Sequence, residues 1–184
     1  MTPFRLVQHS HQPICRVVRR VWRDPLDSSC SQTRSDNRWN TAEFPALYCC
    51  CCERVARAVT LDVLRLAGLV LDDLLSAYQP QLVEASWAGR VADVSSAEGV
   101  AAAGFPPGYP GGVSKERTRS FATACHEAGV EGIMCRSASL AKMGFSTWEG
   151  PHERWGEVAV FTQNCQRPPA LLRRRGDLDW FWQP

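Results

Sequence analysis

The sequence has no apolar run of membrane-spanning length. Its first residues, Met1 to His9, also lack the long apolar stretch of a secretory signal peptide. These two absences exclude the usual sequence signatures of membrane and secreted proteins. We therefore expect a cytoplasmic protein without a membrane partner.

Charge of one sign is not in excess either. The chain has 21 basic and 19 acidic residues, which leave a net charge of +2. A surface that binds nucleic acid normally has a clear excess of lysine and arginine, so we expect no direct nucleic-acid partner. With 184 residues, 45% hydrophobic and 22% charged, the chain is typical of one globular domain with its own core.

Paired metal-binding motifs are missing, although the chain has nine cysteines. Four of them are consecutive, Cys49 to Cys52, and neighbouring side chains on a strand or helix do not all face one metal ion. Cys49 and Cys52 form a C-x-x-C pattern with no second pair of ligands. We therefore expect no metal and treat a zinc site as an alternative. The odd count also argues against a disulfide framework, so buried apolar cysteines are the preferred interpretation.

Short apolar runs and two longer periodic segments are present. The first periodic segment, 53–70, repeats Val55, Val59, Val63, Leu66 and Val70 at helical spacing, which predicts a helix with these residues facing the core. The second begins at Ser114, a typical N-cap, and predicts a helix to about residue 128. Strands are expected near 46–51, 82–87, 91–94, 130–135 and 157–162, and a strand or short helix at 15–22. Together they predict an α+β domain.

The ends of the chain differ from its centre. Residues 1–14 are polar and are interpreted as an irregular leader, residues 15–165 as the domain, and residues 166–184 as a tail. The aromatic end of the tail, 178–182, is expected to dock on the domain or on a partner. A proline- and glycine-rich segment, 104–112, predicts a surface loop that is a candidate lid.

The most informative local pattern is an arginine followed by a tyrosine at a fixed distance. Arg38 stands in the segment Asn-Arg-Trp-Asn, and Tyr48 follows it by ten residues at the end of an apolar run. A guanidinium group matches phosphate oxygens in a bidentate way, and a tyrosine ring can cover a planar base. The pair therefore indicates a pocket for a flat, phosphorylated ligand.

These residues, together with Gly132, Ser137 and the final strand at 157–162, resemble the RES domain over about residues 15 to 165. The resemblance implies a split mixed β-sheet with flanking helices, similar to the ADP-ribosyltransferase fold. It implies NAD as the substrate, cleaved at the nicotinamide–ribose bond by hydrolysis, phosphorolysis or ADP-ribosyl transfer. It also implies the toxin half of a bacterial toxin–antitoxin pair, whose antitoxin carries a helix-turn-helix.

The resemblance assigns roles to individual residues. Arg38 would hold the pyrophosphate, and Tyr48 would stack on the nicotinamide or the adjoining ribose. Ser137 would form a hydrogen bond with a ribose hydroxyl or with the nicotinamide amide. Arg16, with Arg136 as an alternative, would add a phosphate contact.

The sequence departs from the family pattern at the acid. The resemblance implies a glutamate near position 59, where this chain has Val59 and Thr60. Of the nearest carboxylates, Glu53 and Asp62, we prefer Asp62 as the catalytic substitute, and Glu149 is an alternative. The departure leaves a second function open, a catalytically weakened RES-like module that acts through protein contacts. Hydrolysis, phosphorolysis and transfer share one first step and are not distinguished, and a homodimer also stays open.

Overall fold

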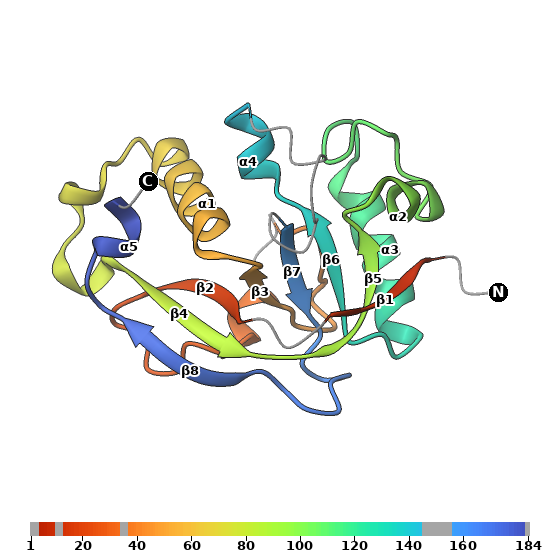
Figure 1. Cartoon of the computed structure of the whole chain (residues 1–184), viewed down its shortest axis with the longest axis horizontal. Coiled ribbons are helices and arrows are strands. Elements are labelled where there is room, and N and C mark those ends of the chain that lie inside the picture. The colour runs from red at the N-terminus through yellow and green to blue at the C-terminus, as the bar shows by residue number, and fades with distance from the viewer. Residues whose placement is uncertain (1–3, 10–12, 34–36, 145–155, 183–184) are drawn as a thin grey trace.

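The chain forms an eight-stranded mixed sheet with helices packed on it (Figure 1), seen here in a computed structural model that describes residues 4–9, 13–33, 37–144 and 156–182. The strand order is β1-β5-β6-β7-β3-β2-β4-β8. Strands and helices alternate irregularly along the chain, so the predicted α+β class is confirmed.

The sheet and its helices are formed by the following segments of the chain. The strands are β1 (Leu6–His9), β2 (Ile14–Arg19), β3 (Leu47–Cys50), β4 (Pro80–Ser86), β5 (Gly89–Val94), β6 (Gly132–Arg136), β7 (Gly156–Val160) and β8 (Ala170–Arg175). The α-helices are α1 (Glu53–Leu66), α2 (Ala97–Ala102), α3 (Lys115–Glu127), α4 (Ala138–Lys142) and α5 (Asp179–Trp182). Short 3-10 turns occupy Ser29–Ser31, Leu71–Asp73 and Ser76–Tyr78. Within the described ranges, no helix combines the length and apolarity needed to cross a membrane.

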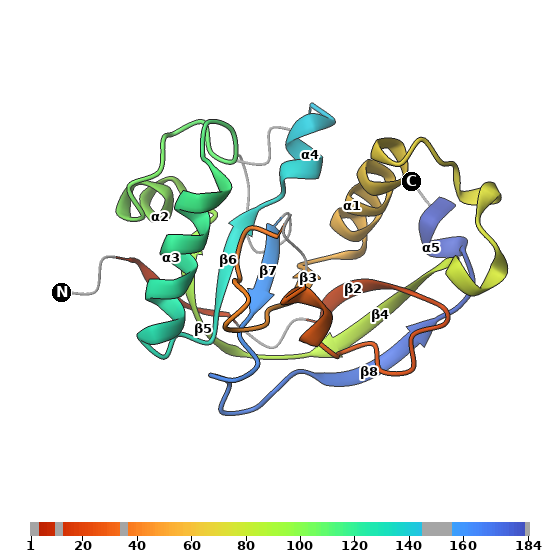
Figure 2. The same ribbon diagram turned by 180° about the vertical axis from the view of Figure 1, so that it is seen from behind.

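The sheet is split where β3 meets β2. Strand β3 pairs with β7 over four residues, whereas its pairing with β2 is the single antiparallel pair Cys15–Cys50. The chain passes between the halves through Trp87 and Ala88, which join β4 to β5. Figure 2 shows these two strands as one long continuous ribbon that runs under both halves. Only the β5–β6 pair is parallel among the pairings described. The result is two half-sheets that diverge from one narrow joint.

Side-chain alternation along the central strands separates three hydrophobic clusters. On one face, Cys135 and Ala159 pack in a cluster beneath α3, and Cys50 packs in a second cluster beneath α1 and α5. On the opposite face, Met134 and Val158 belong to a third cluster. Successive side chains of a strand point to opposite faces, so the first two clusters lie on the same side of the sheet. The two helical clusters therefore meet over the β6-β7-β3 centre.

The core-facing stripe predicted for the first long helix is correct in its first half, where Val55 is buried and Val59 half-buried, and wrong in its second half. Helix α1 ends at Leu66, and Gly68 follows it with a φ of 67°, the left-handed conformation that ends many helices. Val63 and Leu66 are 60% and 70% exposed, while Ala56 and Ala58 are buried. The buried face of the helix is therefore formed by Val55, Ala56, Ala58, Asp62 and Leu64, and the end of the predicted stripe lies outside it.

The two ends of the domain are structured. Within the expected irregular leader, β1 pairs with β5 from Leu6–Ala92 onward. Within the tail, β8 extends the other edge of the sheet, and Trp180 of α5 is 1% exposed beneath α1. The Arg175 guanidinium lies 2.8 Å from the Glu53 carboxylate, which ties the tail to the start of α1.

Candidate functional site

The segment that carries Arg38 is fixed to the sheet by the predicted tyrosine. The Tyr48 hydroxyl accepts a hydrogen bond from the Trp39 backbone N–H and donates one to Asn40 Oδ1, both at 2.9 Å. Arg119 of α3 donates to the Asn37 carbonyl at 3.0 Å. The structure therefore brings Arg38 and Tyr48 together, with the tyrosine hydroxyl positioning the arginine loop and only the ring left to contact a ligand.

The proline- and glycine-rich segment 104–112 packs against the same loop. Phe105 and Tyr109 are buried, and both rings contact the indole of Trp39. Arg136 donates hydrogen bonds to the carbonyls of Pro107 and Tyr109 at 3.1 and 3.0 Å. The segment is thus a surface loop, as predicted, that is anchored by its two buried aromatic rings and by hydrogen bonds from Arg136.

Ser137 lies at the junction of β6 and α4 and is fully buried. Its hydroxyl accepts a hydrogen bond from the Leu140 N–H at 3.3 Å, which caps the helix. It also forms a side-chain hydrogen bond with Glu157. Ser137 is therefore a fully buried helix cap beside Glu157, and its hydroxyl has no exposed surface in this structure.

Glu157, which the sequence reasoning did not select, is the carboxylate beside the predicted residues. It is half-buried on β7, opposite Cys135 of β6 and Cys50 of β3. Burial raises the pKa of its carboxyl, and the Ser137 hydrogen bond and the positive charge of Arg38 offset part of that rise. The sequence did hold a signal for this residue, because a single glutamate stands in an otherwise apolar strand. The face of the sheet on which the glutamate lies could not be assigned until the pairing of that strand was known.

Asp62, the predicted substitute for the family acid, is engaged in an ion-pair cluster between two helices. On α1 its carboxylate accepts from Lys142 Nζ at 2.6 Å and from the Ser139 hydroxyl at 3.1 Å, both on α4. Burial pushes its pKa upward, but the hydrogen bond and charge of Lys142 outweigh burial and hold the pKa below its usual value. Asp62 therefore connects α1 to α4, the helix that Ser137 caps.

Arg16 lies apart from the other predicted residues. It stands between Cys15 and Val17 on β2, whose side chains pack in the cluster beneath α1, so Arg16 points to the opposite face of the sheet. There it donates to the Asp27 carbonyl at 3.1 Å and lies over the Trp22 ring. The structure does not bring Arg16 to the face that carries Tyr48 and Glu157.

The cysteine run is part of the core. Cys49, Cys50 and Cys51 are buried, and desolvation raises the pKa of each thiol, to about 12 for Cys49. A buried thiol with a raised pKa is protonated at neutral pH and is a poor nucleophile or metal ligand. Among the described residues, no group of three or more histidine, cysteine, aspartate or glutamate side chains is arranged to hold a metal ion.

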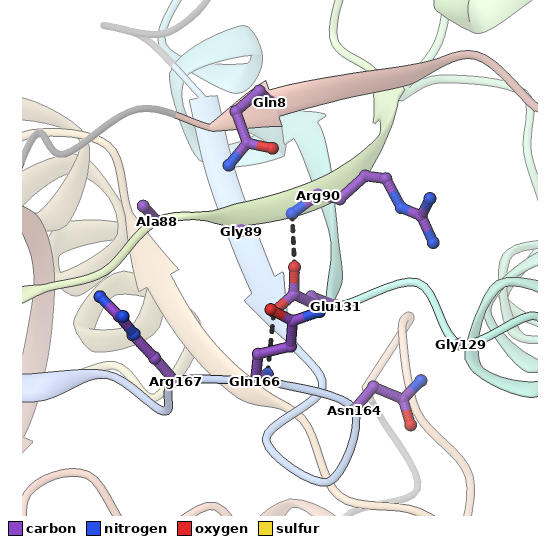
Figure 3. A pocket seen from close by; sticks show the side chains of 9 residues that line it. All are labelled: Gln8, Ala88, Gly89, Arg90, Gly129, Glu131, Asn164, Gln166 and Arg167. Carbon is purple, nitrogen blue, oxygen red and sulfur yellow. Dashed lines mark hydrogen bonds between the residues drawn. The ribbon is translucent and has the colours of Figure 1, made fainter.

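A separate polar hollow of about 380 Å³ lies at the other end of the central strands (Figure 3). Its lining includes Gly89, Arg90 and Glu131, and the Glu131 carboxylate accepts the Arg90 N–H at 2.7 Å. Glu131 directly precedes β6, whereas Arg136 and Ser137 lie at its far end. The hollow is therefore distinct from the site around Glu157.

The site thus joins a cation, an aromatic ring and a desolvated carboxylate on one face of the sheet. Arg38 can match a phosphate, Tyr48 can cover a ring, and Glu157 can stabilise positive charge on a bound ligand.

The raised pKa of Glu157 also makes the stability of the protein depend on pH, because the ionised carboxylate is less stable in the folded protein than in the unfolded chain. Its destabilising effect grows as the pH rises through the interval between its unfolded-state pKa and the raised folded-state pKa.

Removing the Tyr48 hydroxyl tests how the arginine loop is held. Tyr48→Phe should destabilise the protein by about 1–3 kcal/mol, because the buried Trp39 N–H and Asn40 Oδ1 each lose a partner. Thermal unfolding measures this loss. Tyr78→Phe is the matched control, because Tyr78 is 48% exposed and should tolerate the change. Equal melting temperatures for wild type and Tyr48→Phe would show that the loop is held by other contacts.

The domain that contains this site is similar to known proteins in sequence and in structure. The sequence profile of the RES domain matches residues 13–180. A search of proteins with curated functions gives no match. Among solved structures, one similar chain comes from the crystal structure of the M. tuberculosis MbcT–MbcA toxin–antitoxin complex, with a TM-score of 0.70 and 15% identity over 90% of this chain and 83% of that chain. At that identity the likeness establishes the fold.

Proposed function

Because the chain belongs to the RES domain family, we propose that it binds NAD at the site around Glu157 and cleaves the nicotinamide–ribose bond. The observation that carries this proposal is the placement of Glu157 on the same face of the sheet as Tyr48, where burial raises the pKa of its carboxyl and Ser137 and Arg38 both lower it. A half-buried carboxylate whose pKa is raised by burial lowers stability when it ionises, which supports a functional rather than a structural role.

Each residue has a distinct role in the proposed reaction. Arg38 holds the pyrophosphate, and the Tyr48 ring covers the nicotinamide or its ribose while its hydroxyl fixes the arginine loop. Ser137 orients Glu157, and Asp62 keeps α4 in place through Lys142. Cleavage leaves a positively charged ribose, and such a transition state requires rigid positioning and electrostatic support more than a strong nucleophile.

We also propose that this protein is the toxin of a toxin–antitoxin pair. Its fold matches a chain from a solved toxin–antitoxin complex, and the family resemblance includes an antitoxin with a helix-turn-helix. The antitoxin would inhibit the enzyme by covering the site around Glu157. In this arrangement the partner, and not the toxin, carries the DNA-binding surface, which agrees with the near-neutral charge of this chain.

Induced expression in bacteria tests the proposed function. The wild-type chain should lower cellular NAD and stop growth, because each active molecule consumes NAD repeatedly. NAD is measured in extracts at intervals after induction, alongside colony counts, with an uninduced culture as the control. Arrested growth at unchanged NAD would instead support the second candidate, a module that acts through protein contacts.

A further inference from the structure

We propose that Glu157 is the catalytic carboxylate of this chain, facing the ribose during cleavage of the nicotinamide bond and replacing the glutamate that the family resemblance leads us to expect on α1. The inference rests on the proposed NAD-cleaving function and adds the identity of the acid. The expected position on α1 is occupied by Val59, which is half-buried at the margin of the cluster beneath that helix.

The position of Glu157 follows from strand register. Its partners across the sheet are Cys135 on β6 and Cys50 on β3. Cys135 belongs to the hydrophobic cluster beneath α3, and Cys50 belongs to the cluster beneath α1. Alternation places Glu157 on the same face as Ala159, which also packs beneath α3. Glu157 therefore lies at the seam between the two helical clusters, close to where the sheet divides.

The neighbours of Glu157 are the residues assigned to NAD. Ser137 forms a hydrogen bond with the carboxylate, and Arg38 attracts it electrostatically. Tyr48 lies on the same face of the adjacent strand and interacts electrostatically with Glu157. A ligand whose phosphates bind Arg38 and whose ring lies on Tyr48 would present the intervening ribose to this carboxylate.

Asp62 is less suited to this role because its carboxylate is already neutralised. Lys142 lies 2.6 Å away, and Arg65 lies 3.5 Å away on the next turn. A carboxylate paired with two cations offers little net negative charge to a cationic ribose. Glu157 has Arg38 as an attractive neighbour, and in the proposed complex that arginine binds the pyrophosphate instead. Binding of NAD would thus leave the negative charge of Glu157 uncompensated and able to stabilise the ribose cation.

The chemical step is a bond cleavage without proton transfer. The bond between ribose C1′ and the nicotinamide nitrogen breaks, and its electron pair leaves with nicotinamide, which departs as a neutral molecule. The ribose keeps the positive charge, which the Glu157 carboxylate stabilises electrostatically until a lone pair of the acceptor attacks C1′. With water as the acceptor, the products are ADP-ribose and nicotinamide, and one proton passes to solvent.

This role requires the ionised form of Glu157 and so predicts a pH dependence. The charged and titratable groups that act on it among the described residues are Arg38, Tyr48, Cys50, Cys51, Asp62, Tyr109, Cys135 and Lys142. Desolvation dominates over these groups and raises the pKa of Glu157 above the ordinary 4.5. Turnover should therefore fall on acidification with a midpoint above that value, and this acidic limb should disappear when Glu157 is replaced by glutamine.

The decisive variant is Glu157→Gln, assayed for nicotinamide release, NAD binding and thermal unfolding. We expect kcat to fall on the order of 100-fold or more, because one preorganised electrostatic group is lost. NAD affinity should stay within a few-fold, and the melting temperature at neutral pH should be unchanged or higher, because a desolvated charge is removed. Glu84→Gln is the matched control, since Glu84 is a half-buried strand glutamate that is ion-paired with Arg173 outside the site.

The outcomes separate this inference from the proposed function. An active wild type with Glu157→Gln within threefold of it would overturn the role of Glu157 and leave NAD cleavage standing. A wild type that releases no nicotinamide would overturn the proposed function, and the role of Glu157 with it. If the glutamine variant folds poorly, the wild-type pH profile decides, because a kcat without an acidic limb above pH 4.5 contradicts an ionised Glu157.

Discussion

Arg38→Ala should reduce nicotinamide release from NAD by about 100-fold or more and should abolish toxicity in bacteria. The guanidinium is the cation assigned to the pyrophosphate, and losing a charge-assisted clamp costs both affinity and the alignment of the reacting ribose. Steady-state kinetics should show a higher KM and a lower kcat. Arg38→Lys should recover little, because an ammonium group cannot form the bidentate contact.

The controls separate a lost contact from a lost fold. Arg38 is half-buried on a loop that Tyr48 and Arg119 hold through other residues, so the variant should melt within a few degrees of the wild type. Arg167→Ala removes an exposed arginine beside the distant polar hollow and should leave turnover unchanged. Full activity in Arg38→Ala would remove this arginine from the site.

Gly132→Ala should strongly destabilise the protein. A Cβ at this position would lie 2.6 Å from the Ala159 carbonyl oxygen and 3.3 Å from the Val160 Cα, both on β7. Strand β6 lies between β5 and β7, so the clash has no free edge on which to relax. We expect a loss of about 3 kcal/mol, at the upper end of the usual cost of overpacking, and a melting temperature lower by roughly 6–12 °C.

Gly108→Ala is the matched control for this change. No atom lies within 4 Å of a Cβ at Gly108, so the same added methyl group should leave the melting temperature nearly unchanged. Differential scanning calorimetry of the two variants and the wild type makes the comparison. If Gly132→Ala and Gly108→Ala melt together, the close approach of β6 to β7 is not a constraint on the fold.

Local signals in the sequence predicted much of the fold. Ser114 caps α3 through a hydrogen bond from the Arg117 N–H at 3.2 Å, as its position before a helical pattern suggested. The strand at 130–135 is β6, shifted by one or two residues at its ends. These features depend on neighbours in the chain, which a single sequence displays. The β1 strand was missed because its four residues are half-polar and depend on pairing with β5.

Features that depend on distant partners were not predictable in the same way. The buried face of α1 is set by how the helix packs on the sheet, which buries Val55, Ala56 and Ala58 and leaves Val63 and Leu66 exposed. Arg16 stands on a strand whose face could not be assigned until β2 was paired with β3 and β4. The pairing of β7 with β6 and β3 likewise decides that Glu157 lies opposite Cys135 and Cys50, so the carboxylate of the site emerged only from the structure.

The most direct test of the account is nicotinamide release by the purified wild-type protein incubated with NAD. We expect nicotinamide to accumulate over many turnovers, with ADP-ribose or its phosphorylated or protein-linked form as the second product. Release should slow as the pH falls and Glu157 takes up a proton. Recovery of NAD intact after prolonged incubation, with a protein that melts cooperatively, would contradict the assignment of an NAD-cleaving site to this chain.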